Sequence, residues 1–188
     1  MKKFSKVQRV DILGVKDAEY VYDGYLKVKS ANGYEYVVEN DCAIAIVHLL
    51  DFNEILLRKE FIPPFQEKEP TQEFFLTCIS GTIENGETPY KTVIRELVEE
   101  AGILLNSTYT NQELIGDYFF NKANTAKAHI YYIPLRINDY RKVSATGDGS
   151  KIEDVSTTVR VDVKFLNSLK PSDILTAFVI EKMKEKVK

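Results

Sequence analysis

Residues 81–103 read GTIENGETPYKTVIRELVEEAGI, and this stretch decides the fold. Thr88 is placed to cap a helix, Pro89 suits the first helical position, and Gly102 is placed to end the helix. Apolar residues recur at the helical period along one side of this segment: Tyr90, Val93, Ile94, Leu97 and Ala101. The stretch therefore predicts a glycine-containing loop followed by an amphipathic helix.

The same helix carries a set of carboxylates. Glu96, Glu99 and Glu100 share an arc opposite most of the apolar stripe. Glu96 and Glu100 are four residues apart, and such a pair of like charges destabilises a helix by a few tenths of a kcal/mol. A divalent cation would remove this penalty, and Mg²⁺ prefers carboxylate and carbonyl oxygens. Such a run also occurs on the solvated faces of surface helices, so the three carboxylates alone leave both interpretations open.

The loop before the helix has matching features. Glu87 lies eight residues before Arg95 and is placed to pair with it, which would pin the loop to the helix. Gly81 and Gly86 permit backbone conformations that a Cβ atom hinders, so this loop can approach a metal ion closely.

The whole string resembles the Nudix box. It matches that motif at every specified position: Gly81, then five residues, Glu87, then seven residues, Arg95-Glu96-Leu97, one residue, Glu99-Glu100, one residue, and Gly102-Ile103. The expected strand, loop and helix context is also the one the motif requires. The resemblance implies an α+β fold, an α/β/α sandwich around a mixed sheet, with a small β-rich region before it.

The resemblance also implies roles for these residues. Glu96, Glu99 and Glu100 would bind Mg²⁺ or Mn²⁺, with the backbone carbonyl of Ser80 as a further ligand. Four box positions would be structural, with Glu87 and Arg95 holding loop to helix: Gly81, Glu87, Arg95 and Gly102.

The implied reaction is the attack of water on a phosphorus atom of a diphosphate. Metal ions would lower the pKa of the water and neutralise charge on the phosphoryl oxygens. The general base differs among family members, and here it would be a box-helix glutamate, Glu100 or Glu96, or a carboxylate on a later loop. The loop candidate is Glu153, with Asp154 and Asp148 as neighbours, and the alternative for Glu153 is an ordinary charged loop residue.

The flanking sequence predicts further elements. Before the box, strands are expected at residues 20–29 and 34–39, joined by an Asn32-Gly33 turn, and then at 42–50, 54–59 and 73–79, with a loop at 63–72. After the box, strands are expected near 114–120 and 129–137, a long polar stretch at 139–158, a short helix at 163–169 and a final helix at 172–186. The chain is thus divided into a β-rich region, 1–40, and a catalytic domain, 41–188.

This organisation resembles the ADP-ribose pyrophosphatase branch of the family, in which the β-rich region contributes to a homodimer. The resemblance implies that Arg58 would contact a phosphate of the substrate. The alternative is a half-exposed strand arginine paired with a carboxylate. Tyr118 would stack on a base, and the alternative is a core aromatic residue. The sequence departs from the branch at residues 77–81, where Thr-Cys-Ile-Ser-Gly replaces the usual Glu-x-Pro-Ala-Gly.

Composition limits the other function classes. The formal net charge of −3 gives no basic footprint, so extended nucleic-acid binding is disfavoured. Cys42 and Cys78 lie inside apolar runs and are expected to be buried thiols in a reducing, cytoplasmic compartment. The sequence contains no long apolar span, so no membrane-spanning segment is predicted. His48 and His129 are far apart in the sequence and lack cysteine partners, which argues against a zinc site.

Three functions remain open at this point. The first is a Mg²⁺-dependent diphosphatase that cleaves ADP-ribose or a related nucleotide sugar into a nucleoside monophosphate and a sugar phosphate. The second is a pyrophosphatase acting on (deoxy)nucleoside triphosphates, and the third is a nucleotide-binding sensor without turnover. The complete glutamate set argues against the sensor, and the N-terminal strands favour a nucleotide sugar over a triphosphate.

Overall fold

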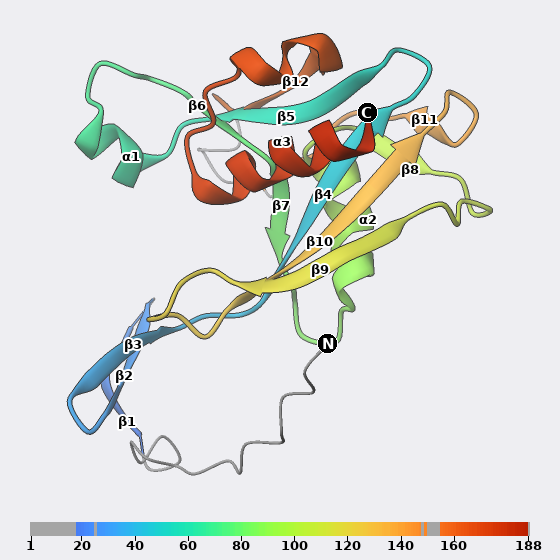
Figure 1. Cartoon of the computed structure of the whole chain (residues 1–188). Helices are drawn as coiled ribbons and strands as arrows, with labels where there is room; N and C mark the ends of the chain where they lie inside the picture. The colour runs from blue at the N-terminus through green and yellow to red at the C-terminus, as the bar shows by residue number, and fades with distance from the viewer. Residues whose placement is uncertain (1–17, 25, 148, 150–154, 188) are drawn as a thin grey trace, which may run out of the picture. The chain divides into compact units, whose positions relative to one another are not determined.

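A computed structural model describes residues 18–24, 26–147, 149 and 155–187 (Figure 1). These residues form two compact units. The smaller unit contains the described residues up to Asn40 together with Phe119–Lys127, and the larger one contains Asp41–Tyr118 and the described part of Ala128–Lys188.

The smaller unit is built on a three-stranded antiparallel sheet of β1 (Glu19–Asp23), β2 (Lys27–Ala31) and β3 (Tyr34–Val38). Asn32 and Gly33 have φ angles of 53° and 82°, as a two-residue hairpin turn requires, so the predicted Asn-Gly turn is confirmed. The single strand predicted at residues 20–29 is wrong. It is a hairpin of β1 and β2, because the Asp23-Gly24 step reverses the chain.

A distant segment completes this unit. Val37 of β3 donates a backbone hydrogen bond to the carbonyl oxygen of Ala123 (2.8 Å), and Thr125 donates one to the carbonyl oxygen of Val37 (3.0 Å). The sequence did not predict this pairing, since it joins residues more than eighty positions apart.

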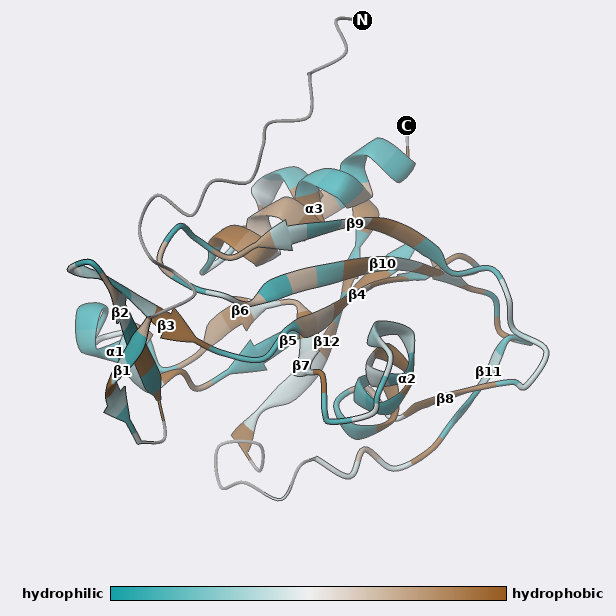
Figure 2. Cartoon of the chain, turned by 90° about the horizontal axis from the view of Figure 1, so that it is seen from below, coloured by the Kyte–Doolittle hydropathy of each residue, from teal (hydrophilic) through white to brown (hydrophobic). Residues whose placement is uncertain are grey.

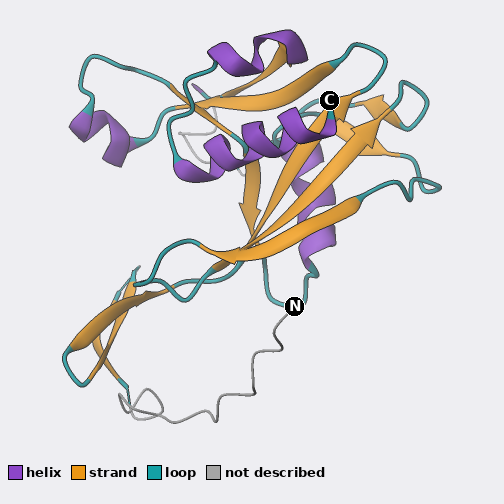
Figure 3. Cartoon of the chain, in the orientation of Figure 1, coloured by secondary structure: helices purple, strands orange, loops and turns teal. Residues whose placement is uncertain are grey.

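The larger unit contains a seven-stranded mixed sheet (Figure 3). Five strands run in the order β12-β5-β4-β10-β9, with β6 beside β5 and β7 beside β4. The strands are β4 (Cys42–Leu49), β5 (Glu54–Glu60), β6 (Phe75–Thr77), β7 (Ile79–Thr82), β9 (Glu113–Phe119), β10 (Lys127–Leu135) and β12 (Thr157–Asp162). β4 pairs in parallel with β10 and antiparallel with β5, so the sheet is mixed as predicted.

Helices cover both faces of this sheet. Figure 2 shows α2 (Pro89–Glu99) and α3 (Ile174–Lys186) on opposite sides of the strands. Successive side chains of β4 point to opposite faces: Val47 belongs to the core cluster that contains Leu97 of α2, and Ile44 and Ile46 belong to the one that contains Met183 of α3. Because both faces of β4 are covered, it reads as a continuous apolar run, and the predicted α/β/α sandwich is confirmed.

Two predictions between β5 and the box are wrong. Residues 63–72 were expected to form a loop, but they begin with a short helix, α1 (Pro63–Lys68), whose prolines suit a helical first turn. Residues 73–79 were expected to form one strand, but the chain divides at Cys78 into β6 and β7. The break occurs because β6 pairs with β5 whereas β7 pairs with β4, and the backbone N–H of Cys78 instead donates to Oγ1 of Thr176 (2.9 Å).

The remaining elements are short. β8 (Ile103–Leu105) and β11 (Tyr140–Lys142) form a two-stranded ladder that the sequence did not predict. The short helix predicted at residues 163–169 is confirmed as η3, a 3₁₀-helix at Val163–Ser168, and the last predicted helix is α3, capped by Asp173. Within the described part of the chain, no helix is both long and apolar enough to cross a membrane.

Candidate active site

Helix α2 begins and ends where the sequence indicates. Oγ1 of Thr88 accepts a hydrogen bond from the backbone N–H of Lys91 (3.3 Å), and Pro89 occupies the first turn. Gly102 has a φ angle of 59°, a left-handed conformation suited to glycine, and its carbonyl accepts from the N–H of Val143 (2.9 Å). These contacts fix the register of the helix and therefore the positions of its carboxylates.

The carboxylate arc of α2 is largely buried rather than solvated. Glu96 and Glu100 are each only 7% exposed, because this side of the helix faces the sheet at β7. A cavity of about 400 Å³ opens there, and its lining combines the β7 backbone with the helix carboxylates: Ser80, Gly81, Thr82, Glu84, Arg95, Glu96, Glu99 and Glu100. Burial of this kind excludes the simple interpretation of the run as the solvated face of a surface helix.

Arg95 is the centre of the acidic cluster. Its Nε lies 3.2 Å from Oε1 of Glu87, and one terminal nitrogen lies 2.5 Å from Oε1 of Glu96 and 2.9 Å from Oε2 of Glu99. The other terminal nitrogen donates to the carbonyl oxygen of Thr82 (2.9 Å). Burial acts to lower the pKa of Arg95, but the hydrogen bonds to Glu87 and Glu99 outweigh it and raise the pKa. Arg95 is therefore a permanent cation that ties the loop, β7 and two helix carboxylates together.

Glu87 anchors the loop before the helix. Hydrogen bonds from Arg95, and then from the hydroxyl of Thr92, lower the pKa of Glu87 to about 2. Its Oε2 also accepts a hydrogen bond from the backbone N–H of Glu84 (3.2 Å). The structure thus contains the loop-to-helix pair expected of Glu87 and Arg95.

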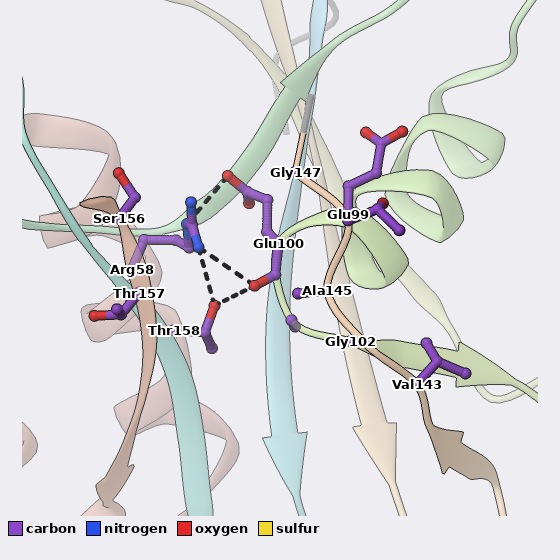
Figure 4. A pocket seen from close by; sticks show the side chains of 12 residues that line it. Arg58, Glu99, Glu100, Gly102, Val143, Ala145, Gly147, Ser156, Thr157 and Thr158 are labelled. Carbon is purple, nitrogen blue, oxygen red and sulfur yellow. Dashed lines mark hydrogen bonds and ion pairs between the residues drawn. The ribbon is translucent and has the colours of Figure 1, made fainter. Parts of the chain in front are cut away.

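Glu100 is held by a second arginine. Arg58 of β5 is 3% exposed, and its Nε lies 3.2 Å from Oε1 of Glu100. The hydroxyl of Thr158, on β12, donates to the carbonyl oxygen of Glu100 (2.7 Å), and the N–H of Ser80 donates to Oε2 of Glu100 (3.2 Å). Figure 4 shows Arg58 and Thr158 converging on Glu100. Arg58 is thus more buried than the half-exposed position considered from the sequence, and its contacts match the alternative of a strand arginine paired with a carboxylate.

A second cavity is also lined by Glu99 and Glu100 (Figure 4). Its volume is about 470 Å³, and Glu99 and Glu100 line both cavities. The remaining lining comes from β5, from the end of α2, from the segment after β11 and from the start of β12: Arg58, Ala101, Gly102, Val143, Ala145, Thr146, Gly147, Ser156, Thr157 and Thr158.

The carboxylate cavity fits a divalent cation in its chemistry. Its lining carries four carboxylates, those of Glu84, Glu96, Glu99 and Glu100, against one guanidinium, a formal excess of three negative charges. An added Cβ atom at Gly81 would overlap the carboxylate of Glu96, so only glycine leaves room for that group. Among the described residues, no three acidic, histidine or cysteine side chains already converge as the ligands of one ion, and the box glutamates are ion-paired with Arg95 and Arg58 instead.

The other candidate residues lie elsewhere. Tyr118, on β9, is 41% exposed and packs its ring against Phe178 of α3, with centroids 5.0 Å apart. It does not line either cavity beside Glu99 and Glu100. Glu153, Asp154 and Asp148 fall outside the described residues.

The sequence analysis did not identify three residues that surround Arg58. Thr158 of β12 and Thr77 of β6 lie opposite Arg58 in the two neighbouring ladders. Glu60, two positions after Arg58, lies 3.6 Å from its Nε. Only strand pairing brings Thr158 and Thr77 to this place, and no local motif marks them.

Fold and site define the class of protein, and comparison with known families agrees. Residues 40–171 match the NUDIX domain, which covers well over half of the chain, so the protein belongs to the Nudix family and is a Nudix hydrolase.

Two known proteins are similar over most of the chain. The ADP-ribose pyrophosphatase of Bacillus subtilis (strain 168) is 24% identical over 164 residues, which cover 86% of this chain and 82% of the relative. A solved structure described as an ADP compounds hydrolase matches with a TM-score of 0.66 and 19% identity, covering 90% of this chain and 91% of the other. The expected family membership and the resemblance to ADP-ribose pyrophosphatases are confirmed.

Proposed function

We propose that the protein is a Mg²⁺-dependent diphosphatase that hydrolyses ADP-ribose or a related nucleotide sugar. The products would be a nucleoside monophosphate and a sugar phosphate. The observation that carries the proposal is the cavity at β7, where the three box glutamates are gathered with an excess of negative charge. The similarity to an ADP-ribose pyrophosphatase supports the substrate class.

Glu96, Glu99 and Glu100, with the carbonyl of Ser80, would hold the ion. The bound metal would supply acidification of a water molecule and neutralisation of charge on the phosphoryl oxygens. Arg95 orients Glu96 and Glu99, and Ser80 orients Glu100 by its backbone N–H. The chain thus presents charged oxygen donors on a rigid helix and strand, which limits reorganisation during the reaction.

A glutamate of the box helix or a loop carboxylate would take the proton from the attacking water. We propose Glu100 and Glu96 as the helix candidates and Glu153 as the loop candidate. Replacing Glu153 by glutamine separates them, because general-base catalysis contributes about 10²–10⁴-fold in rate. A loss smaller than about tenfold would exclude Glu153 as the base.

The second cavity supports a nucleotide sugar over a triphosphate. It shares Glu99 and Glu100 with the carboxylate cavity, so a diphosphate bound near the glutamates could extend into it. Its walls offer the hydroxyl groups of Ser156, Thr157 and Thr158, which suit a hydroxyl-rich sugar. A triphosphate has no second sugar to fill this space.

The test is phosphate release, with phosphatase coupling, from ADP-ribose, other nucleotide sugars, dinucleotides and nucleoside triphosphates, with and without Mg²⁺. We expect strong Mg²⁺-dependent turnover of ADP-ribose or another nucleotide sugar. Glu100→Gln should abolish most of it, and Glu181→Gln, the same change on the exposed side of α3, should not. Turnover restricted to triphosphates would contradict the substrate class, and wild-type turnover by Glu100→Gln would contradict the metal site.

We also propose that the region 1–40 mediates a homodimer. Tyr20, Tyr22 and Tyr34 are exposed on its sheet, and aromatic side chains are enriched at protein interfaces. Light scattering coupled to gel filtration tests this directly. A monomer at micromolar concentration would contradict the proposal.

A further inference from the structure

The guanidinium of Arg58 lies between two carboxylates rather than beside one. Its Nε is 3.2 Å from Oε1 of Glu100 and 3.6 Å from Oε1 of Glu60. Arg58 and Glu100 are almost fully buried, and the side chain of Glu60 is 23% exposed. Burial strengthens these interactions because solvent screens them little.

The strands set this arrangement. Arg58 and Glu60 are two residues apart on β5, so their side chains lie on the same face of the sheet. Thr77 of β6 lies directly opposite Arg58 in the ladder, and its hydroxyl donates to Oε2 of Glu60 at 2.5 Å. One oxygen of Glu60 is therefore fixed by Thr77, and the other faces Arg58.

The two carboxylates share one guanidinium. Glu60 and Glu100 carry two negative charges, and Arg58 carries one positive charge. Glu100 also lines the carboxylate cavity together with Glu96 and Glu99, where a divalent cation would bind.

We infer that Glu60 is a positioning residue, which with Thr77 draws Arg58 partly toward itself and so weakens the hold of Arg58 on Glu100, a proposed ligand of a divalent cation. Without Glu60, Arg58 would hold the carboxylate of Glu100 more strongly and would compete better with the cation for it. This inference rests on the proposed function, because it assigns Glu100 to the metal site.

Two substitutions remove the proposed effect in different ways. Glu60→Gln keeps the shape of the side chain and removes its charge. Thr77→Val keeps the branched shape and removes the hydroxyl that fixes Glu60, whereas Thr77→Ser retains the hydroxyl. Glu54→Gln is the matched control, since Glu54 lies on the same strand but pairs with Arg160.

The experiment is Mn²⁺ binding to the full chain without substrate, measured by electron paramagnetic resonance. Glu60→Gln should weaken binding about tenfold, as changes to the neighbours of metal ligands commonly do. Thr77→Val should weaken it in the same direction, and Thr77→Ser and Glu54→Gln should bind as the wild type does. In steady-state assays, Glu60→Gln should raise the metal concentration needed for half-maximal rate more than it lowers kcat at saturating metal.

Wild-type Mn²⁺ affinity in a folded Glu60→Gln variant would overturn the inference. If that variant does not fold, equal binding by Thr77→Val and Thr77→Ser would overturn it instead. In either case the proposed function would stand, provided that Glu100→Gln abolishes binding. A wild-type chain that binds no Mn²⁺ would overturn both the inference and the proposed metal dependence.

Discussion

Gly81→Ala tests the carboxylate cavity with one methyl group. Gly81 pairs with Ala43 of β4 in the middle of the sheet, and its φ angle is outside the left-handed region, so the backbone itself tolerates alanine. The new Cβ atom would occupy the space of the Glu96 carboxyl group. Because strand pairing holds β7 in place, we expect the side chain of Glu96 to move away from the cavity.

The size of the effect follows from the contacts of Glu96. Its carboxylate accepts a hydrogen bond from Arg95 at 2.5 Å, and hydrogen bonds to charged groups contribute about 1.5–3 kcal/mol. Both side chains retain some solvent exposure, so the lower half of that range applies. A loss of about 1.5–2.2 kcal/mol corresponds to a fall in Tm of roughly 3–9 °C for a chain of this size. Metal affinity should fall by more than the roughly 10–100-fold typical of changes to a ligand's neighbour, since a proposed ligand itself is displaced.

Thermal melting with and without Mg²⁺ is the assay, and Gly86→Ala is the control. Gly86 has a φ angle of 86° and no atom near its missing Cβ, so alanine there strains the backbone by about 1 kcal/mol without touching Glu96. Both variants should melt below the wild type. Only Gly81→Ala should lose the Mg²⁺-dependent rise in Tm and the metal-dependent turnover. A normal Mg²⁺ response in Gly81→Ala would refute the assignment of Glu96 to the metal site.

Three further predictions concern stability. Leu97→Ala removes a fully buried side chain between α2 and the sheet and should cost about 2–5 kcal/mol in urea unfolding. Gly102→Ala places a Cβ atom 2.5 Å from the carbonyl oxygen of Val143 at a φ angle of 59°, and should cost roughly 1–3 kcal/mol in the same assay. Burial lowers the pKa of His48, whose Nδ1 is hydrogen-bonded with the hydroxyl of Tyr132. As the pH falls, the unfolded chain therefore protonates this imidazole before the folded chain does. Stability should therefore decrease as the pH falls below about 6.5, by at most about 1.4 kcal/mol per pH unit, and His48→Gln should flatten that dependence.

The parts of the fold that the sequence predicted correctly depend on local signals. The cap, the proline and the terminating glycine of α2 are all near neighbours in the chain, and each acts within one helical turn. The buried strand β4 is marked by its own apolar run. The box carboxylates were found for the same reason, because their spacing on one helix is a property of a short segment.

The parts that were missed depend on pairing between distant segments. The division of residues 73–79 into β6 and β7 follows from two different partner strands, which no periodicity within the segment reveals. The same holds at the site, where Thr77 occupies the position of the acidic residue in the Glu-x-Pro-Ala-Gly pattern. A carboxylate is nevertheless present, since Glu60 reaches Thr77 from β5. The strand register thus brings a carboxylate beside this position, which the linear motif alone does not reveal.

The two arginines explain how three glutamates can gather at the cavity before any cation binds. Arg95 holds Glu96 and Glu99 from within the same helix, and Arg58 holds Glu100 from the sheet. A buried carboxylate without a partner is strongly destabilising, so these pairs allow the helix to pack on β7 before any cation binds. The same pairs would oppose a bound ion, because a cation at this site would have to share each carboxylate with an arginine. The excess of negative charge around the cavity would favour the cation in this competition. Glu60→Gln and Gly81→Ala should both weaken the binding of that cation, the first by removing a charge near Arg58 and the second by moving the carboxylate of Glu96.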